Sequence, residues 1–218
     1  MSEKQESCKQ CGRCCKAGGP ALHTKDLALV KEGKIPLRNL ITIRQGELAH
    51  NPITGSIAPT NVELVKIKGK GKDWDCCYLN AAAKTCSIYE SRPEACRALK
   101  CWQPEELLEM VEKDTLSRLD ILAEDDPIRP LVEEHEKLVR CPDMEEIAAL
   151  RPKIPEPKRK ALQSLVNEDI KFRVFAVQEH KLELSDELFY FGRPLFQLLQ
   201  PLGAKVRETA EGLELSWI

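Results

Sequence analysis

The chain has 218 residues, of which 31% are charged and ten are cysteine, and its formal net charge at pH 7 is -2. This length allows one sizeable domain with its own hydrophobic core, so metal is not needed merely to compensate for small size. The near-neutral charge excludes the global basic field typical of nucleic-acid-binding proteins, and no polybasic run suggests a membrane surface. We therefore expect no nucleic acid and no membrane as partners.

The amino-terminal residues are polar and lead directly to cysteine, without the apolar run of a signal peptide. No segment is apolar for long enough to span a bilayer. These features predict a cytoplasmic protein. Because thiols stay reduced in the cytoplasm, we expect the cysteines to bind metal or to do redox chemistry rather than to form disulfides.

The residues after the first cysteines predict a loop and then a short helix. Residues 17–20 read Ala-Gly-Gly-Pro, which breaks a helix because glycine is conformationally free and proline cannot continue the hydrogen-bond ladder. Thr24 is a candidate N-cap for a helix over 26–30, and Gly33 is placed to end it. This helix is expected to be scaffold.

Four segments of the first half predict short antiparallel strands. Residues 40–44 and 62–68 carry β-branched side chains in near alternation, and turn residues bound them. Residues 76–79 and 85–89 predict two shorter strands joined by a turn. That arrangement would put the cysteines of both segments on adjacent strand ends.

A helix start is predicted at Ser91-Arg-Pro-Glu94, with serine as the cap, proline in the first turn and glutamate three residues after the serine. Cys96 would lie in the first turn, where exposed N–H groups and the helix dipole stabilise a thiolate. We expect the helix to end near Lys100, since an ideal helix would rotate Cys101 well away from the face of Cys96.

The second half predicts helices and a terminal hairpin. Residues 105–121 carry apolar side chains near helical spacing and predict one strong helix. The aromatic segment 188–191 is expected to dock back on the helices, and residues 204–217 alternate in the manner of a hairpin. Further helices are expected over 131–139, 144–150 and 158–178.

The predicted fold class is α+β: a small cysteine-organised antiparallel sheet and turns packed with several helices, followed by a C-terminal helix and β-hairpin. Four divisions of the chain are predicted. They are a cysteine-rich metal-binding domain over 1–103, an acidic helical region packed on it over 104–150, a proline-rich linker over 151–160, and a C-terminal helix, aromatic segment and hairpin over 161–218.

Nine of the ten cysteines fall in two groups that lie far apart in the sequence. A C-x-x-C pair lets two sulfurs converge on one metal because the loop between them turns sharply, and Gly12 suits that turn. Such a polar amino terminus offers no core in which four thiols could simply be buried. We expect both groups to meet around metal. The first group is Cys8, Cys11, Cys14 and Cys15, and the second is Cys76, Cys77, Cys86, Cys96 and Cys101.

Together the two groups resemble a known family. The C-x-x-C-x-x-C-C run, joined with C-C-Y-L at 76–79, C-S-I-Y-E-S-R-P at 86–93 and the two later cysteines, is similar to the CxxCxxCC family, the YkgJ-type zinc- or iron-chelating domains. The resemblance covers residues 8–101 and leaves the rest of the chain outside the shared pattern. It implies a cysteine-bound metal centre.

The family spacing implies that Cys76 is the ligand of the adjacent pair and that Cys77 is an extra thiol. The predicted metal ligands are therefore Cys8, Cys11, Cys14, Cys15, Cys76, Cys86, Cys96 and Cys101.

The identity of the metal is only partly indicated by these ligands, because eight thiolates match two Cys₄ sites of zinc or iron, or one cluster with a neighbouring site. Two features favour iron. The overlapping run resembles a cluster-binding run, and basic residues beside the cysteines could offset the charge of a cluster. We predict an iron–sulfur cluster in preference to zinc. The basic residues are Lys9, Arg13, Lys16, Lys84, Arg97 and Lys100.

Five other residues carry weaker signals. Cys77 and Cys141 belong to no recognisable pair, so each is as readily a buried thiol as a ligand. His135 could be a remote ligand, but a surface histidine of an acidic helix is the favoured interpretation. Trp74 and Trp102 bracket the second group and are expected to be ordinary core residues more readily than a shield against water.

Three functional hypotheses remain. The leading one is a cytoplasmic iron–sulfur protein that serves electron transfer or supports a partner enzyme. The second is a structural zinc module that presents its acidic helices and aromatic tail to a protein partner. The third, implied by family relatives that are lysine N-methylases of flagellin, is an enzyme, although no G-x-G-x-x-G loop, Walker motif or nucleophile constellation supports it.

Overall fold

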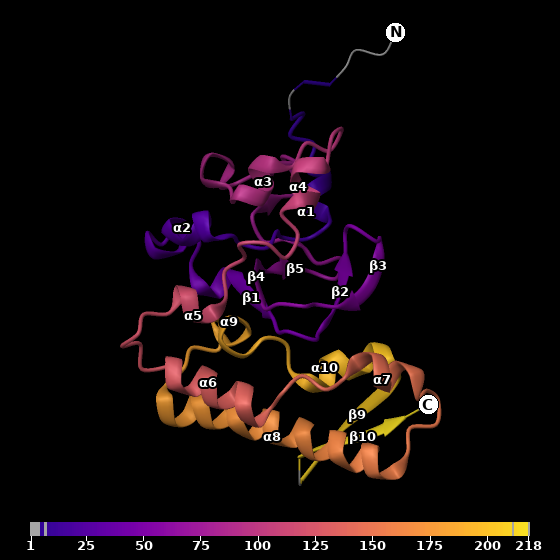
Figure 1. The fold of residues 1–218 in the computed structure, drawn as a ribbon. Helices are drawn as coiled ribbons and strands as arrows, with labels where there is room; N and C mark the ends of the chain where they lie inside the picture. The colour runs from indigo at the N-terminus through magenta and orange to yellow at the C-terminus, as the bar shows by residue number, and fades with distance from the viewer. Residues whose placement is uncertain (1–4, 7, 211, 218) are drawn as a thin grey trace.

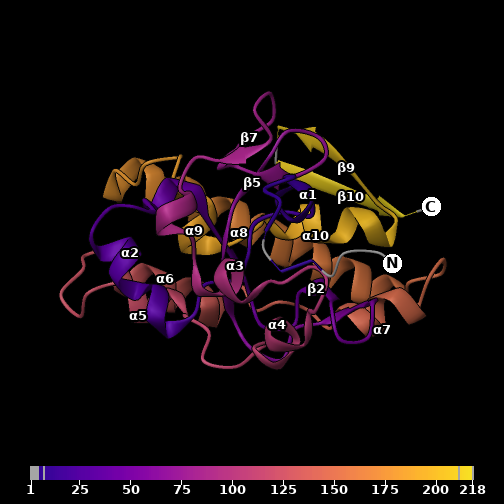
Figure 2. The ribbon, with the colours of Figure 1, turned by 90° about the horizontal axis from the view of Figure 1, so that it is seen from above.

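The computed structural model describes residues 5–6, 8–210 and 212–217. The strands and short helices of the first half form one part, and the longer helices with the terminal hairpin form another part beneath it (Figure 1). Figure 2 shows from above that the first half lies across the helices of the second. Among the described residues, no helix combines the length and the hydropathy that a membrane-spanning segment needs. The α+β fold class is confirmed.

The predicted pair of longer strands is present. Strands β1 (Leu40–Ile43) and β4 (Leu64–Ile67) run antiparallel, and Ala21 adds a bridge to Lys66 on the other side of β4. All four residues of β1 are buried, whereas burial alternates along β4. One face of β4 therefore packs in the core, and the other face is left for other contacts.

A hairpin that the sequence did not predict lies between these strands. Strand β2 (Leu48–Asn51) pairs with β3 (Ser56–Pro59), and the Asn51 side chain accepts the backbone N–H of Ile53 at 2.9 Å in the turn. The hairpin is largely exposed, and Ile57 is 71% exposed. Because neither strand has a buried apolar face, the sequence lacks the alternation of apolar and polar residues that predicts a half-buried strand.

Two very short strand pairs carry Cys76 and Cys86. Strand β5 (Gly69–Lys70) pairs with β6 (Asp75–Cys76), and β7 (Leu79–Asn80) pairs with β8 (Thr85–Cys86). The predicted hairpin is present, but Cys86 lies opposite Leu79 and Cys76 belongs to the preceding pair.

The helices of the first half are too short to be stable in isolation and depend on packing. They are α1 (Arg13–Lys16), α2 (Leu27–Lys31), α3 (Glu94–Ala98), α4 (Glu105–Glu109) and α5 (Arg118–Ile121). The 3₁₀ turns of the described chain are η1 (Thr24–Asp26), η2 (Leu37–Asn39), η3 (Tyr89–Ser91) and η4 (Gln200–Leu202).

The prediction of one helix over 105–121 is wrong, because α4 ends at Glu109 and α5 begins only at Arg118. Between them, Glu112 and Asp114 have positive φ angles of 57° and 49°, which no α-helix accommodates. Two residues after Asp114, Leu116 donates its N–H to Leu22 O at 3.0 Å instead of to a helical carbonyl. Tertiary backbone pairing thus overrides the local helical pattern.

The second half contains the longer helices. The long helix α8 (Glu156–His180) begins inside the predicted proline-rich linker, because a proline is tolerated in the first turn of a helix. The predicted division of the chain into four parts stays a prediction. The remaining elements are α6 (Arg129–Leu138), α7 (Met144–Ala149), α9 (Glu187–Phe191), α10 (Leu195–Leu199), β9 (Ala204–Thr209) and β10 (Gly212–Trp217).

The buried side chains of the described residues form two hydrophobic clusters. The first joins β1, β4 and Cys76 to the aromatic residues of α9, which therefore dock back into the protein as predicted. The second lies among α7, α8, α10 and the antiparallel pair of β9 and β10. The cysteine-rich half is thus packed on the helical half through α9.

A buried polar cluster lies between the two hydrophobic clusters. The Asp169 carboxylate of α8 is fully buried, shares a hydrogen bond with His135 Nε2 at 2.8 Å, and accepts Arg173 Nε and the backbone N–H of Leu195, both at 2.7 Å. Burial acts to raise the pKa of Asp169, but the bond to His135 and the charge of Arg173 outweigh it, so the pKa is lowered. Asp169 is therefore a buried anion that ties α6, α8 and α10 together.

Replacing Asp169 with asparagine should lower the free energy of unfolding by about 3 kcal/mol, because it removes the buried charge opposite Arg173. Urea denaturation measures the loss. Glu168→Gln alters the exposed neighbour on the same helix and should change stability by less than about 0.5 kcal/mol. Equal denaturation midpoints for the two variants would show that the Asp169 cluster is not stabilising.

Candidate metal centre

The first cysteine motif is shaped by a tight turn at Gly12. Gly12 has a φ of 74°, a conformation that glycine adopts without strain, and the short helix α1 with Cys14 and Cys15 follows directly. A Cβ at Gly12 would lie 3.3 Å from Leu79 Cδ1 and 3.5 Å from Lys84 O. The motif therefore rests on the hairpin that ends in Cys86, and the two cysteine groups meet in space.

The second group reaches the same place from three elements. Cys76 is buried at the end of β6, Cys86 is partly buried at the end of β8, and Cys96 lies in the first turn of α3. Asp26 positions α3 from a distance, because its Oδ1 accepts the backbone N–H of Glu94 at 2.8 Å. Ser91, the cap predicted from the sequence, lies in η3 instead.

Five thiols gather at this meeting point. The Sγ atoms of Cys14 and Cys15 are 4.0 Å apart. Cys15 is electrostatically coupled to Cys14, Cys76 and Cys86, and Cys96 to all four of the others. The gathered thiols, named the five-thiol group below, are Cys14, Cys15, Cys76, Cys86 and Cys96.

The environment disfavours ionised thiols unless a cation is present. Burial, followed by repulsion from Cys14, raises the pKa of Cys15 to about 12. Burial likewise raises the pKa of Cys96, with repulsion from the other four thiols adding to it. Burial and repulsion therefore outweigh the stabilisation of a Cys96 thiolate that was predicted from its position in the first turn of the helix. Since a metal ion binds thiolates and compensates their charge, the donor set fits a metal that prefers sulfur ligands.

Three predicted ligands lie at the edge of this group or outside it. Cys8 is exposed, accepts the backbone N–H of Gln10 at 3.4 Å, and acts electrostatically on Cys14. Cys11 and Cys101 are exposed, and neither is among the groups that shift the pKa values of the five thiols. Their role as ligands stays a prediction.

The described thiols do not form a closed ligand shell around a single ion. In residues 5–6, 8–210 and 212–217, no three His, Cys, Asp or Glu side chains are arranged to hold a single metal ion.

Two weaker candidates lie away from the five-thiol group. Cys141 packs with the second hydrophobic cluster, where its Sγ would lie 3.9 Å from a Cβ placed on Gly46. His135 is fully buried on Asp169, with the rings of Phe172 and Phe191 centred 5.2 and 4.8 Å away. The prediction of a surface histidine is wrong, because His135 lies on the inner face of α6.

The basic residues predicted to offset the charge of the centre are partly engaged elsewhere. Arg97 donates to the backbone carbonyls of Arg92 and Glu90, and Lys100 pairs with Glu106 at 2.7 Å. The pKa values of Cys86 and Cys76 are both raised. The positive charges of Arg92, beside Cys86, and of Lys70, beside Cys76, offset part of that increase. Lys70 also donates to Leu79 O at 2.7 Å. Sequence reasoning missed Lys70 because it lies six residues before the nearest cysteine.

The two tryptophans that bracket the second cysteine group are not deeply buried. Trp74 is 45% exposed, and its ring lies so close to Gly69 that a Cβ there would be 2.4 Å from Cγ. Its Cδ1 also approaches Gly18, in the loop that follows the first cysteine motif. Trp74 therefore covers the loop between the cysteine groups and is not a core residue.

The gathered thiols define a cysteine-based metal-chelating protein. The CxxCxxCC family, described as "Putative zinc- or iron-chelating domain", matches residues 7–116, which is 110 of the 218 residues. The chain belongs to this family, as the resemblance predicted. No curated protein matches it, and no solved structure matches it.

Replacing Cys96 with serine should remove most of the bound metal, because a hydroxyl of much higher pKa cannot replace a thiolate ligand. Metal content per chain, measured by mass spectrometry after purification, checks this expectation. Cys141→Ser is the matched control in the other hydrophobic cluster and should retain wild-type metal content.

Cys77→Ser tests whether Cys76, and not its neighbour Cys77, is the metal ligand. Cys77 is in hydrogen-bonding contact with Cys76 but does not act on Cys15 or Cys96. Its variant should therefore keep its metal, whereas Cys76→Ser should lose it. Metal loss from Cys77→Ser alone would reverse the assignment.

Proposed function

We propose that the five-thiol group, with Cys8, Cys11 and Cys101, holds an iron–sulfur cluster that serves electron transfer or supports a partner enzyme in the cytoplasm. The observation that carries this proposal is the gathering of five thiols from four separate elements, close enough to act on one another electrostatically. Such a cluster supplies one-electron redox chemistry when it is bound.

The number of the thiols supports a multinuclear centre, because five gathered thiols exceed the four ligands of one tetrahedral ion. In a cluster, the cysteines bind different irons, so their sulfurs need not converge on one point. The protein's contribution is to fix the thiols in a partly buried place and to provide Lys70 and Arg92 against the negative charge.

The exposure of the centre supports exchange of electrons with a partner. Cys14 is exposed and Cys15 is partly buried, whereas Cys76 lies beneath them in the first hydrophobic cluster. A cluster held in this way would have one side close to the protein surface. We propose a protein partner that docks over α1, within reach of that side.

A structural zinc site is the second candidate, and the Cys14–Cys15 separation is compatible with it. Tetrahedral zinc with Zn–S bonds of about 2.3 Å places its sulfurs about 3.8 Å apart, close to the 4.0 Å between these two thiols. In that case the metal would lock the two cysteine groups together without redox chemistry. Two sulfurs on one iron of a cluster would be similarly close, so this distance alone does not favour zinc over iron.

Protein purified without oxygen should be brown, should contain iron and acid-labile sulfide, and should lose visible absorption on addition of dithionite. The reason is that iron–sulfur clusters absorb visible light in a redox-dependent manner, whereas zinc has no redox chemistry. Metal and sulfide analysis accompanies the spectrum. Colourless protein that carries stoichiometric zinc and neither iron nor sulfide would overturn the iron–sulfur proposal and leave the zinc module.

A further inference from the structure

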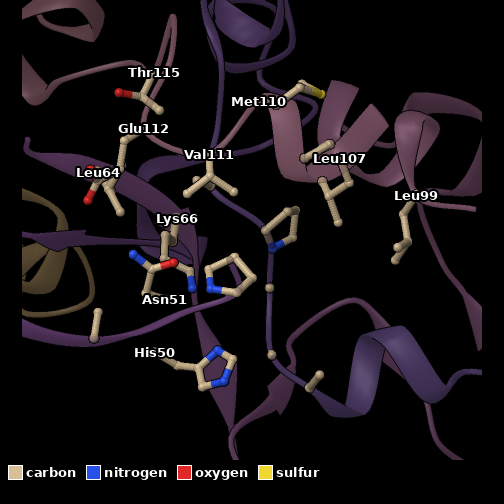
Figure 3. A pocket seen from close by; sticks show the side chains of 18 of the residues that line it. His50, Asn51, Leu64, Lys66, Leu99, Leu107, Met110, Val111, Glu112 and Thr115 are labelled. Carbon is tan, nitrogen blue, oxygen red and sulfur yellow. The ribbon is translucent and has the colours of Figure 1, made fainter. Parts of the chain in front are cut away.

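A cavity of about 600 Å³ opens beside the five-thiol group. Four of the thiols form part of its wall, and the rest comes from the loop after α1, hairpin β2–β3, strand β4, and the segment from α3 to Thr115. Figure 3 shows the labelled part of this wall from close by. Cavities of about 300–1,000 Å³ with a mainly apolar lining and a few polar groups are typical small-molecule sites. The size of this cavity therefore fits a small organic ligand.

The lining is mainly apolar on the side of α4. Figure 3 shows Leu107, Met110 and Val111 on one part of the wall, and Leu64 and Lys66 of strand β4 on another. Such a surface favours contact with hydrocarbon over water. The apolar side chains labelled in Figure 3 are Leu64, Leu99, Leu107, Met110 and Val111.

Lys66 is a cavity-lining lysine whose positive charge is not paired with a neighbouring side chain in the described part of the chain. Along β4, burial alternates so that Val65 and Ile67 lie in the hydrophobic cluster, whereas Leu64 and Lys66 line the cavity. Within the described part of the chain, the Lys66 ammonium makes no hydrogen bond and no ion pair. Burial, with a smaller contribution from the positive charge of Arg193, lowers its pKa. A buried ammonium without a partner is stabilised by a ligand that brings a negatively charged group within hydrogen-bonding distance of it.

The nearby acidic group of the cavity is already engaged. Glu112 accepts the backbone N–H of Asn61 at 3.1 Å and its side-chain amide at 2.7 Å. The ring of His23 is likewise held, since its Nδ1 lies 3.0 Å from Lys113 O. The described wall therefore offers an unpaired cation and no unpaired carboxylate beside it.

We propose that this cavity binds a small apolar carboxylic acid, whose carboxylate pairs with Lys66 and whose hydrocarbon part lies against α4 and the segment that follows it. The proposal does not depend on which metal the neighbouring thiols hold. Because Cys14, Cys15, Cys76 and Cys96 share the cavity wall, a bound acid would lie next to the metal centre.

Decanoate and decan-1-ol test this proposal, because they share a hydrocarbon chain and differ in charge. Isothermal titration calorimetry of the metal-loaded full chain should detect decanoate binding. Lys66→Met keeps an unbranched apolar side chain and should weaken decanoate binding at least about tenfold, the usual value of a charge-assisted hydrogen bond. The same variant should leave binding of decan-1-ol within about twofold.

Two matched controls exclude indirect effects. Lys171→Met removes an exposed lysine of α8 and should bind decanoate as the wild type does. Val111→Trp fills the cavity and should abolish binding of both ligands, whereas Val174→Trp, on an exposed surface, should not. Metal content and melting temperature are measured for every variant.

Wild-type protein with full metal content that shows no decanoate binding at millimolar concentration would overturn the proposal. So would equal affinities of Lys66→Met and Lys171→Met, or unchanged binding in Val111→Trp. These outcomes leave the metal proposal intact, because iron, sulfide and zinc are measured on the same samples.

Discussion

The metal centre depends on the free-energy cost of holding several thiolates close together in a partly buried place. The five-thiol group is partly buried, and in that setting the pKa of Cys15 rises to about 12 because charged sulfurs are poorly solvated and repel one another. Holding the two cysteine groups together as thiolates therefore requires positive charge. Lys70 and Arg92 provide part of it, and a bound metal would provide the rest. Metal binding and docking of the first motif should thus be coupled.

The scaffold around this centre uses buried aspartates in place of local helix caps. Both α3 and α10 have a proline at the N-cap, and neither has a side-chain cap of its own. Asp26 instead accepts an N–H at the start of α3, and Asp169 accepts one at the start of α10. Each aspartate thus fixes a short helix from a distant part of the chain, and in α3 that helix carries Cys96.

Much of the local structure followed from short-range patterns. The β-branched alternation of β1 and β4, the terminal hairpin and the helices α6, α7 and α8 were predicted because each is long or periodic enough to be recognised locally. The break between α4 and α5 was not, since it depends on pairing of Leu116 with Leu22. The exposed hairpin β2–β3 was missed for the opposite reason, because it lacks any apolar periodicity.

The sequence by itself determined the metal-chelating family and the two cysteine groups, because ligand type and spacing are encoded in residues close together along the chain. Only the tertiary structure decided which thiols meet, since Cys14, Cys15, Cys76, Cys86 and Cys96 are contributed by four elements joined through long loops. It also placed Lys66 in an apolar cavity beside them. No local pattern distinguishes that lysine from its neighbours, because its environment comes from segments far away in the sequence.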